Sequence, residues 1–282
     1  MKRFKKLIVR AIALVMICTA IFSFTACADV KKVELKLALY NYTDKVMYAE
    51  EEVTMTIDLY RHLAPETVDA IIAYINDGYY NDAVFYKMSG YSTQIMVGDL
   101  KMVDGELKQF TKPAIEGEFE KGGTTGSNLL NARGSIGLWR TWNAYDNSYS
   151  TSSNTDTGRA TWFMPTEEIS SYNDWFCVFA QIDLENTVNS TALDALVSAF
   201  SSSANYEEYV IYYTGEYDKE KVDENYGLTY NCTLKEDFIE DDVDDLFVAE
   251  GEELVCFNKY TVQVPKTSEG ELGAKIISAK VK

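Results

Sequence analysis

Alternating apolar positions mark two strands near the start of the chain. In residues 33–39 every second residue is Val or Leu, and charged or small residues stand between them. Residues 53–60 repeat this period of two. Because successive side chains of a strand point to opposite faces of a sheet, both stretches are predicted to be half-buried antiparallel strands, with residues 41–52 as their connection.

Two later stretches have the spacing of amphipathic helices instead. The apolar residues that recur at helical spacing after Pro65 are Val68, Ile71, Ile72 and Ile75. Pro is favourable at the first helical position and Gly commonly ends helices, so one helix is predicted from Pro65 to about Asn76, stopped near Gly78. The residues that predict a second helix by the same spacing are Leu193, Leu196, Val197 and Phe200.

The first 26 residues have the pattern of an export signal. Residues 2–10 hold five cations and no acid, and an apolar run follows over 11–24. That run is too short for a membrane span of about 20 residues and is typical of a secretory signal. The next residues, F-T-A-C, resemble a bacterial lipoprotein cleavage box, which implies a lipid-modified Cys27 at the outer face of the bacterial cell membrane. The alternative is an ordinary signal peptide cut near Ala26 or Ala28.

The charge of the chain restricts its partners. The formal net charge is −18, and the predicted leader would take five cations with it. Contact with nucleic-acid phosphates needs clusters of Lys and Arg, so this balance argues against nucleic acid as a partner and also against an acidic substrate. It favours a solvated surface held away from an anionic membrane.

Cysteine and histidine usage indicates no metal site and no nucleophilic catalysis. Cys177 lies in an apolar run and is predicted to be core, whereas Cys232 and Cys256 either pair in an oxidising exterior or remain two buried thiols. His62 is the one histidine, and no nucleophile motif accompanies it. Because neither C-x-x-C nor H-E-x-x-H occurs, we expect no zinc site and no cofactor.

The stretch from Phe85 to Asp99, F-Y-K-M-S-G-Y-S-T-Q-I-M-V-G-D, starts with aromatic residues and closes on a Gly-Asp turn. It resembles the substrate-groove segment of the cyclophilin-type peptidyl-prolyl isomerases, whose usual pattern is F-H-R-V-I-P-G-F-M-I-Q-G-G-D. Phe85, Gly98 and Asp99 match. Lys87 stands at the arginine, Met96 stands at the glutamine, and the segment is one residue longer. The resemblance therefore indicates the fold more strongly than the activity.

Further stretches follow in the order that this family would have them. Residues 113–120 (P-A-I-E-G-E-F-E) and 128–141 (N-L-L-N-A-R-G-S-I-G-L-W-R-T) are similar to segments of its bacterial branch, and 160–164 (A-T-W-F-M) resembles its S-Q-F-F-I strand. Residues 173–182 resemble the next loop and strand, and the C-terminal K-I-I-S-A-K-V fits the last strand. The resemblance implies a mainly β fold, a closed antiparallel β-barrel capped by two α-helices.

Residues 201–258 have no counterpart in that family. They hold seven tyrosines, and an acidic run extends from residue 236 to 253. We interpret them as an elaboration inserted before the last strand and packed on the barrel. The acids could bind calcium, but D-D-V-D-D lacks the glycine of an EF-hand loop, and a solvated face is the preferred interpretation. The predicted organisation is a leader (1–26), a short tether (27–32) and one cyclophilin-like domain (33–282).

The resemblance also implies roles for individual residues. Lys87 takes the position of the catalytic arginine, with a solvated strand-edge cation as the alternative. Trp139, where the family has a small residue, either fills part of the groove or is an ordinary core or surface aromatic. The other expected substrate-binding residues are Phe85, Met96, Thr161, Phe163, Tyr172 and Phe176. A long loop rich in Ser, Thr, Asn and Asp, residues 143–158, is expected to border the groove.

Three functions are compatible with this pattern. The first is a peptidyl-prolyl cis-trans isomerase that assists the folding of exported proteins at the cell surface, with activity weakened by the substituted groove positions. The second is a non-catalytic module that binds peptides or partner proteins in the same groove. In the third, the barrel is a structural carrier for residues 201–258. We expect a monomer whose partners are proline-containing peptides or exported proteins, and a membrane contact through the lipid anchor alone.

Overall fold

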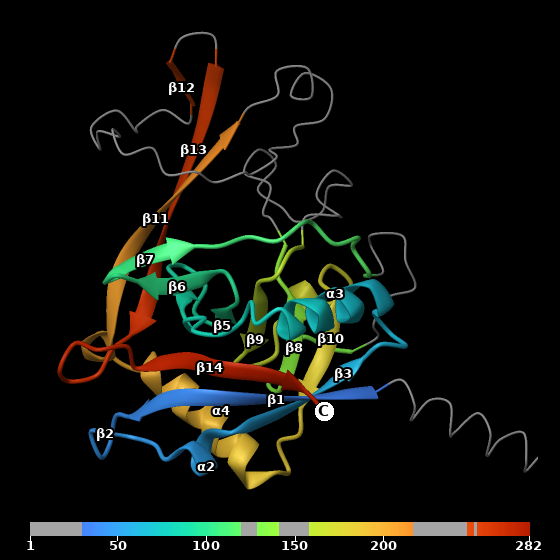
Figure 1. Ribbon diagram of the computed structural model, residues 1–282, viewed down its shortest axis with the longest axis vertical. Coiled ribbons are helices and arrows are strands. Elements are labelled where there is room, and N and C mark those ends of the chain that lie inside the picture. Colours follow the sequence, from blue (N-terminus) through green and yellow to red (C-terminus); the bar gives the residue numbers. More distant parts are fainter. Residues whose placement is uncertain (1–29, 120–128, 141–157, 217–246, 251–252) are drawn as a thin grey trace, which may run out of the picture.

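The computed structural model describes residues 30–119, 129–140, 158–216, 247–250 and 253–282, and Figure 1 shows their arrangement. The predicted leader with Cys27, the partner cysteine Cys232 and nearly all of the predicted loop at 143–158 lie outside the described residues. Within the described ranges, the helices are all too short or too polar to cross a membrane.

Most of the strands form one curled antiparallel sheet. Its strands in spatial order are β14 (Ala274–Val281), β1 (Val30–Asn41), β3 (Met55–Tyr60), β10 (Val178–Ile182), β8 (Ser135–Leu138), β9 (Trp162–Pro165) and β5 (Gln94–Val97), with β2 (Val46–Met47) paired to β1. The predicted strands near the N-terminus, at 160–164 and at the C-terminus are confirmed. Val53, predicted to begin a strand, instead ends the short helix α2 (Glu50–Val53).

Residues 82–86 lie between the two edge strands of this sheet. The Tyr86 N–H donates to the Met96 carbonyl of β5 at 2.9 Å, and the Asp82 N–H donates to the Ile276 carbonyl of β14 at 2.8 Å. β5 and β14 do not pair with each other directly. The structure therefore has a curled half-barrel, and the fully closed barrel implied by the resemblance stays a prediction.

Both predicted helices are confirmed, and each has a defined start. In α3 (Pro65–Asn76) the first N–H groups lack helical partners, and the Glu118 carboxylate accepts from the N–H groups of Glu66 and Thr67 at 3.0 and 2.8 Å. In α4 (Thr187–Ala199) the Asn186 side chain caps the helix. Figure 1 shows α3 above β1 and β14 and α4 below them.

A second sheet leaves the half-barrel as a long arm (Figure 1). β11 (Tyr206–Glu216) pairs with β13 (Glu253–Pro265) along its length, β12 (Phe247–Glu250) pairs with the distal end of β13, and β4 (Lys87–Met88) pairs with its proximal end. The predicted boundary of the elaboration at residue 258 falls inside β13. A hairpin of β6 (Leu100–Val103) and β7 (Glu106–Gln109) forms a third, two-stranded sheet.

The largest apolar cluster, called the main core here, fills the inner face of the half-barrel. It combines inward-facing strand residues with the apolar faces of α3 and α4, including Ile57, Ile71, Trp162, Phe179 and Leu193, which are fully buried. The apolar residues that form the period-two and helical patterns of the sequence are the residues whose side chains fill this cluster. Burial of each aliphatic side chain of this kind stabilises the folded state by about 1.5–3 kcal/mol.

Candidate functional site

The pairing of β5 with β9 gives the sheet a second apolar face, on its outer side. Met96 pairs with Phe163, and their neighbours Val97 and Trp162 also pair. Because side chains alternate between faces, Val97 and Trp162 enter the main core, whereas Met96 and Phe163 lie together in a second cluster outside the sheet. This outer face carries most of the residues that the resemblance assigned to the substrate groove.

Five predicted residues meet in this second cluster, called the aromatic cluster here: Met96, Trp139, Phe163, Tyr172 and Phe176. The Phe176 ring lies 5.3 Å from that of Phe163 and stacks on Tyr172 and Trp139 at 4.4 and 5.5 Å between ring centroids. Such pairs contribute about 0.5–1.5 kcal/mol each beyond burial. Phe163, Met96 and Phe176 are almost completely buried, because the side chains of this cluster pack against one another.

Gly137 of β8 explains how the Phe163 ring sits. Gly137 pairs directly with Phe163, and an added Cβ atom would come within 2.3 Å of the ring. The tip of the ring therefore lies against the backbone of β8 at a position that has no side chain. A larger residue at position 137 would displace Phe163 from the aromatic cluster.

Lys87 does not join this cluster. In the segment before it, Tyr86 bridges to Met96 and faces the aromatic cluster, as does Met88, so Lys87 between them points to the other face. Its Nζ donates to the Ser92 carbonyl at 2.6 Å and lies 5.3 Å from the centre of the Phe200 ring. Burial lowers the pKa of Lys87, and the charge of Glu167 partly opposes that shift.

Tyr86 instead connects the cluster to a buried acid, Asp99. Its hydroxyl donates to Asp99 Oδ1 at 2.7 Å, and the Gln109 amide donates to Oδ2 at 3.3 Å. Burial raises the pKa of Asp99, while hydrogen bonds from Tyr86, Gln109 and Thr161 oppose that rise. Thr161, predicted to bind substrate backbone, thus has the Asp99 carboxylate as a partner inside the protein.

The arm forms one wall of the aromatic cluster. β13 extends the sheet beyond β4, with Val262 opposite Met88 and Gln263 opposite Lys87. The side chains of Val262 and Val264, together with Ile211 of β11, are buried against the cluster. The aromatic cluster is therefore covered on this side by apolar side chains from the arm.

Arg140 brings a buried guanidinium to the opposite side of the cluster. Its Cζ lies 4.5 Å from the Phe119 ring centre and 5.4 Å from that of Phe176, within the range of cation–π attraction. Its Nε donates to the Trp175 carbonyl at 2.8 Å. Arg140, Tyr86 and the cluster residue Gln94 were not assigned from the sequence. Arg140 belongs to the family-like W-R-T stretch, whereas the face of Tyr86 depends on pairing that no local pattern signals.

The remaining predicted site residues lie elsewhere. Phe85 is buried in the main core, and Cys27 lies outside the described residues. Cys177 is a buried free thiol, as predicted for a core residue. In the described part of the chain, no three His, Cys, Asp or Glu side chains are grouped as a metal site would need.

Comparison with known proteins identifies this architecture. The family of cyclophilin-type peptidyl-prolyl cis-trans isomerases matches residues 46–211, more than half of the chain. No curated protein matches the chain. A crystal structure of a Cryptosporidium parvum cyclophilin-type isomerase is 15% identical, covers 58% of this chain and 84% of its own, and has a TM-score of 0.38. The structure described as solved in the presence of the dipeptide Ala-Pro is 16% identical, with 57% and 84% covered and the same TM-score. On the strength of the sequence match, the chain belongs to the cyclophilin-type peptidyl-prolyl cis-trans isomerase family.

Proposed function

We propose that this chain is a peptidyl-prolyl cis-trans isomerase of weakened activity that acts on exported proteins at the outer face of the bacterial cell membrane. Family membership supports the reaction, and the cationic and apolar leader ending in F-T-A-C supports the location. In this proposal Cys27 carries the lipid anchor, the protein is a monomer, and residues 82–86 complete the family's barrel between β14 and β5.

The reaction makes modest chemical demands. Rotation about an X-Pro bond has a barrier of about 18–20 kcal/mol because the amide has partial double-bond character. A catalyst needs an apolar surface for the proline ring and a donor that favours the twisted amide over either planar form. It needs neither a nucleophile nor a metal. The aromatic cluster supplies the apolar surface.

The donor is the weak part of this site, and its placement carries the proposal of low activity. Lys87 lies on the face opposite Phe163, where its ammonium bonds the Ser92 carbonyl. Ile211, Val262 and Val264 occupy part of the apolar surface. A peptide that reached the cluster would gain contact with aromatic rings, and no lysine would face its prolyl nitrogen from β4.

Two partly exposed aromatic rings also favour the second function, a non-catalytic module that binds peptides. Tyr91 and Trp139 pack edge to face at 5.8 Å and keep part of their surface accessible next to the buried floor of the cluster. Aromatic side chains with one accessible face suit peptide binding even where no bond is isomerised. A non-catalytic peptide-binding module is therefore the alternative to the enzyme.

A protease-coupled assay on a short X-Pro peptide, with micromolar protein, separates the two functions. We expect a rate slightly above the uncatalysed one for the wild type and at least a tenfold smaller increment for Phe163→Leu. Ile57→Val, a main-core change of similar chemistry, is the control and should keep the wild-type increment. Absence of any increment together with measurable peptide binding would establish the non-catalytic module.

The location has its own test. In a bacterial host that processes lipoproteins, Cys27→Ser should release the protein from the membrane fraction into the surrounding medium or compartment. Retention of the variant with membranes would contradict a lipid anchor at Cys27.

A further inference from the structure

Gln94 is a polar residue on the floor of the aromatic cluster. It begins β5 and pairs with Pro165 of β9, two residues from the pair formed by Met96 and Phe163. By the alternation of strand side chains, Gln94 shares the outer face with Met96 and Phe163. Its exposed fraction is 1%, so the carboxamide is inside the protein and not on its surface.

Both polar atoms of this carboxamide lack a hydrogen-bond partner among the described residues. Gln94 is the one residue among the described ones with both polar side-chain atoms buried and unpaired; Gln109 and Asn131, which have an unpaired oxygen, still donate through their nitrogen atoms, to Asp99 and Asn173. An unsatisfied buried polar group costs about 1–3 kcal/mol, and native proteins contain few of them. Gln94 therefore carries this cost at both of its polar atoms.

The chemistry of the unpaired group indicates what would satisfy it. A carboxamide offers N–H donors and a carbonyl acceptor, as a peptide unit does, so each can satisfy the other in a pair of hydrogen bonds. Neither a charged ligand nor a metal is suggested, because the amide is neutral and the charged groups beside this face, Asp99 and Arg140, already have partners within the protein. The partly exposed Tyr91 and Trp139 lie at the accessible side of the same cluster.

We propose that the Gln94 side chain binds the backbone of a peptide that enters the aromatic cluster, its Nε2 donating to a peptide carbonyl and its Oε1 accepting from a peptide N–H. The inference rests on the proposed function, since it requires that this cluster receives peptide. It adds a specificity: the cluster recognises an extended backbone next to the proline, in addition to the proline ring itself. Met96 and Thr161, the positions where the resemblance expected such contacts, offer a thioether and a hydroxyl already bonded to Asp99.

The test uses the nearly isosteric variant Gln94→Met in the whole mature chain. Binding of a short X-Pro peptide is measured by calorimetry, and stability by urea unfolding. We expect the peptide dissociation constant to rise about tenfold, because the variant loses both hydrogen bonds to the peptide backbone. We expect the urea midpoint to rise, because an unsatisfied amide is replaced by an apolar group of similar size. A structural glutamine with hidden partners would instead lower the midpoint.

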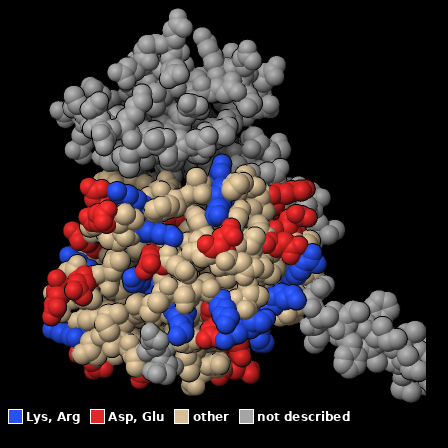
Figure 2. All heavy atoms as spheres, in the orientation of Figure 1, with Lys and Arg blue, Asp and Glu red and all other residues tan. Residues whose placement is uncertain are grey.

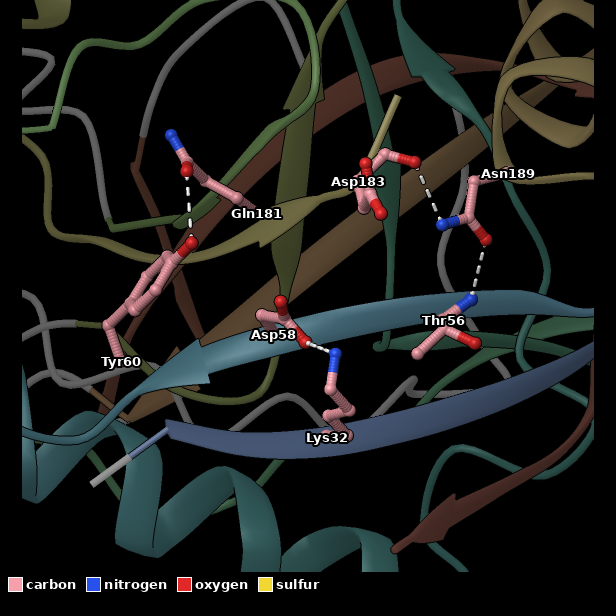
Figure 3. Close-up of polar contacts among 7 residues, drawn as sticks. All are labelled: Lys32, Thr56, Asp58, Tyr60, Gln181, Asp183 and Asn189. Atoms are coloured by element: carbon pink, nitrogen blue, oxygen red, sulfur yellow. Dashed lines mark hydrogen bonds and ion pairs between the residues drawn. The ribbon is translucent and has the colours of Figure 1, made fainter. Parts of the chain in front are cut away.

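Gln181→Met is the matched control. Gln181 belongs to β10, and its Oε1 accepts from the Tyr60 hydroxyl at 3.1 Å, outside the aromatic cluster and close to the Lys32–Asp58 ion pair (Figure 3). This change should lower the urea midpoint slightly, because Tyr60 loses its acceptor, and should leave peptide affinity unchanged. The two glutamine variants are thus expected to shift the urea midpoint in opposite directions, and only Gln94→Met is expected to change peptide affinity.

The outcomes are distinguishable. Wild-type binding or turnover with an unchanged affinity in Gln94→Met overturns the role of Gln94 and leaves the proposed function standing. No binding and no turnover by the wild type overturns the proposed function, and the inference with it. Should Gln94→Met fail to fold, the assigned side-chain amide resonance of Gln94 in the wild type decides: it shifts on addition of peptide, or the proposal is wrong.

Discussion

The two faces of the β5–β9 pair differ although they are made of alternating residues on the same strands. The inner face enters the main core, where aliphatic and aromatic side chains from strands and helices bury one another. The outer face holds stacked rings with polar groups among or beside them: the Tyr86–Asp99 pair, the Arg140 guanidinium and the Gln94 amide. Buried polar groups cost free energy unless they are hydrogen-bonded, and both polar atoms of Gln94 lack a partner among the described residues.

The space-filling view shows how charged residues are distributed over the surface. Figure 2 shows acidic and basic residues spread over the described surface, with tan areas between them, and no extended basic field on the side of the molecule that it draws.

The largest effect is expected on the inner face. Trp162→Ala removes a fully buried ring and the donor to the Tyr80 hydroxyl, at 2.8 Å, and should lower the free energy of unfolding by about 4 kcal/mol. Urea unfolding measures the loss. Peptide affinity of the fraction that remains folded should stay within twofold of the wild type. A large loss of affinity in folded protein would mean that the two faces are not independent.

A smaller effect is expected where the arm meets the aromatic cluster. Val262→Ala should lower stability by about 2 kcal/mol and raise the isomerisation rate, because it removes part of the wall that narrows the cluster. Val33→Ala, an equal truncation in the main core, is the control, with a similar loss of stability and an unchanged rate. Equal rates for both variants would show that the arm does not limit access.

A pH-dependent effect is expected at Asp99. Burial raises its pKa in the folded state, so between the ordinary value of about 3.9 and the raised value the folded protein holds more protons than the unfolded chain. Stability from this group therefore falls as pH rises through that window. Asp99→Asn should remove this slope, which urea unfolding across the acidic range measures against the wild type. A wild-type slope that persists in the variant would assign it to another group.

The smallest effect is expected at Lys87. Because its ammonium faces away from Phe163 and bonds the Ser92 carbonyl, Lys87→Ala should change the isomerisation rate by less than twofold. The same protease-coupled assay measures it. A rate reduced tenfold or more would show that Lys87 reaches the substrate and that its sequence-based role is correct.

Much of the fold could be predicted from local patterns. Pro65 and Gly78 bound α3 because φ restriction and a left-handed turn are local properties of these residues. Apolar and polar residues alternate in β1 and β3 because one face of each strand is buried in the main core. The end of the elaboration could not be predicted, because β13 continues as a regular strand through residue 258 and only its pairing with β4 and β11 defines where it belongs.

The site was predictable only in part, for a related reason. Met96, Trp139, Phe163, Tyr172 and Phe176 could be grouped because they fall in segments that resemble the family. Lys87 could not be oriented, because the pairing of Tyr86 with Met96 decides which of two neighbouring residues faces the groove, and a shift of one residue exchanges the faces. The role of Gln94 could not be predicted, because whether a buried amide lacks hydrogen-bond partners depends on the residues that surround it in the folded chain.

By itself the sequence determined the elements, their order and the family, because helix spacing, strand alternation and turn residues act over a few neighbouring positions. Only the tertiary structure decided that Phe163 lies under the chain's own rings, that β13 builds a wall beside it, and that Lys87 faces away. The wall depends on contacts between residues more than a hundred positions apart, and the facing of Phe163 and Lys87 depends on strand register. Such contacts arise when the whole chain has buried its apolar surface, and no local pattern encodes them.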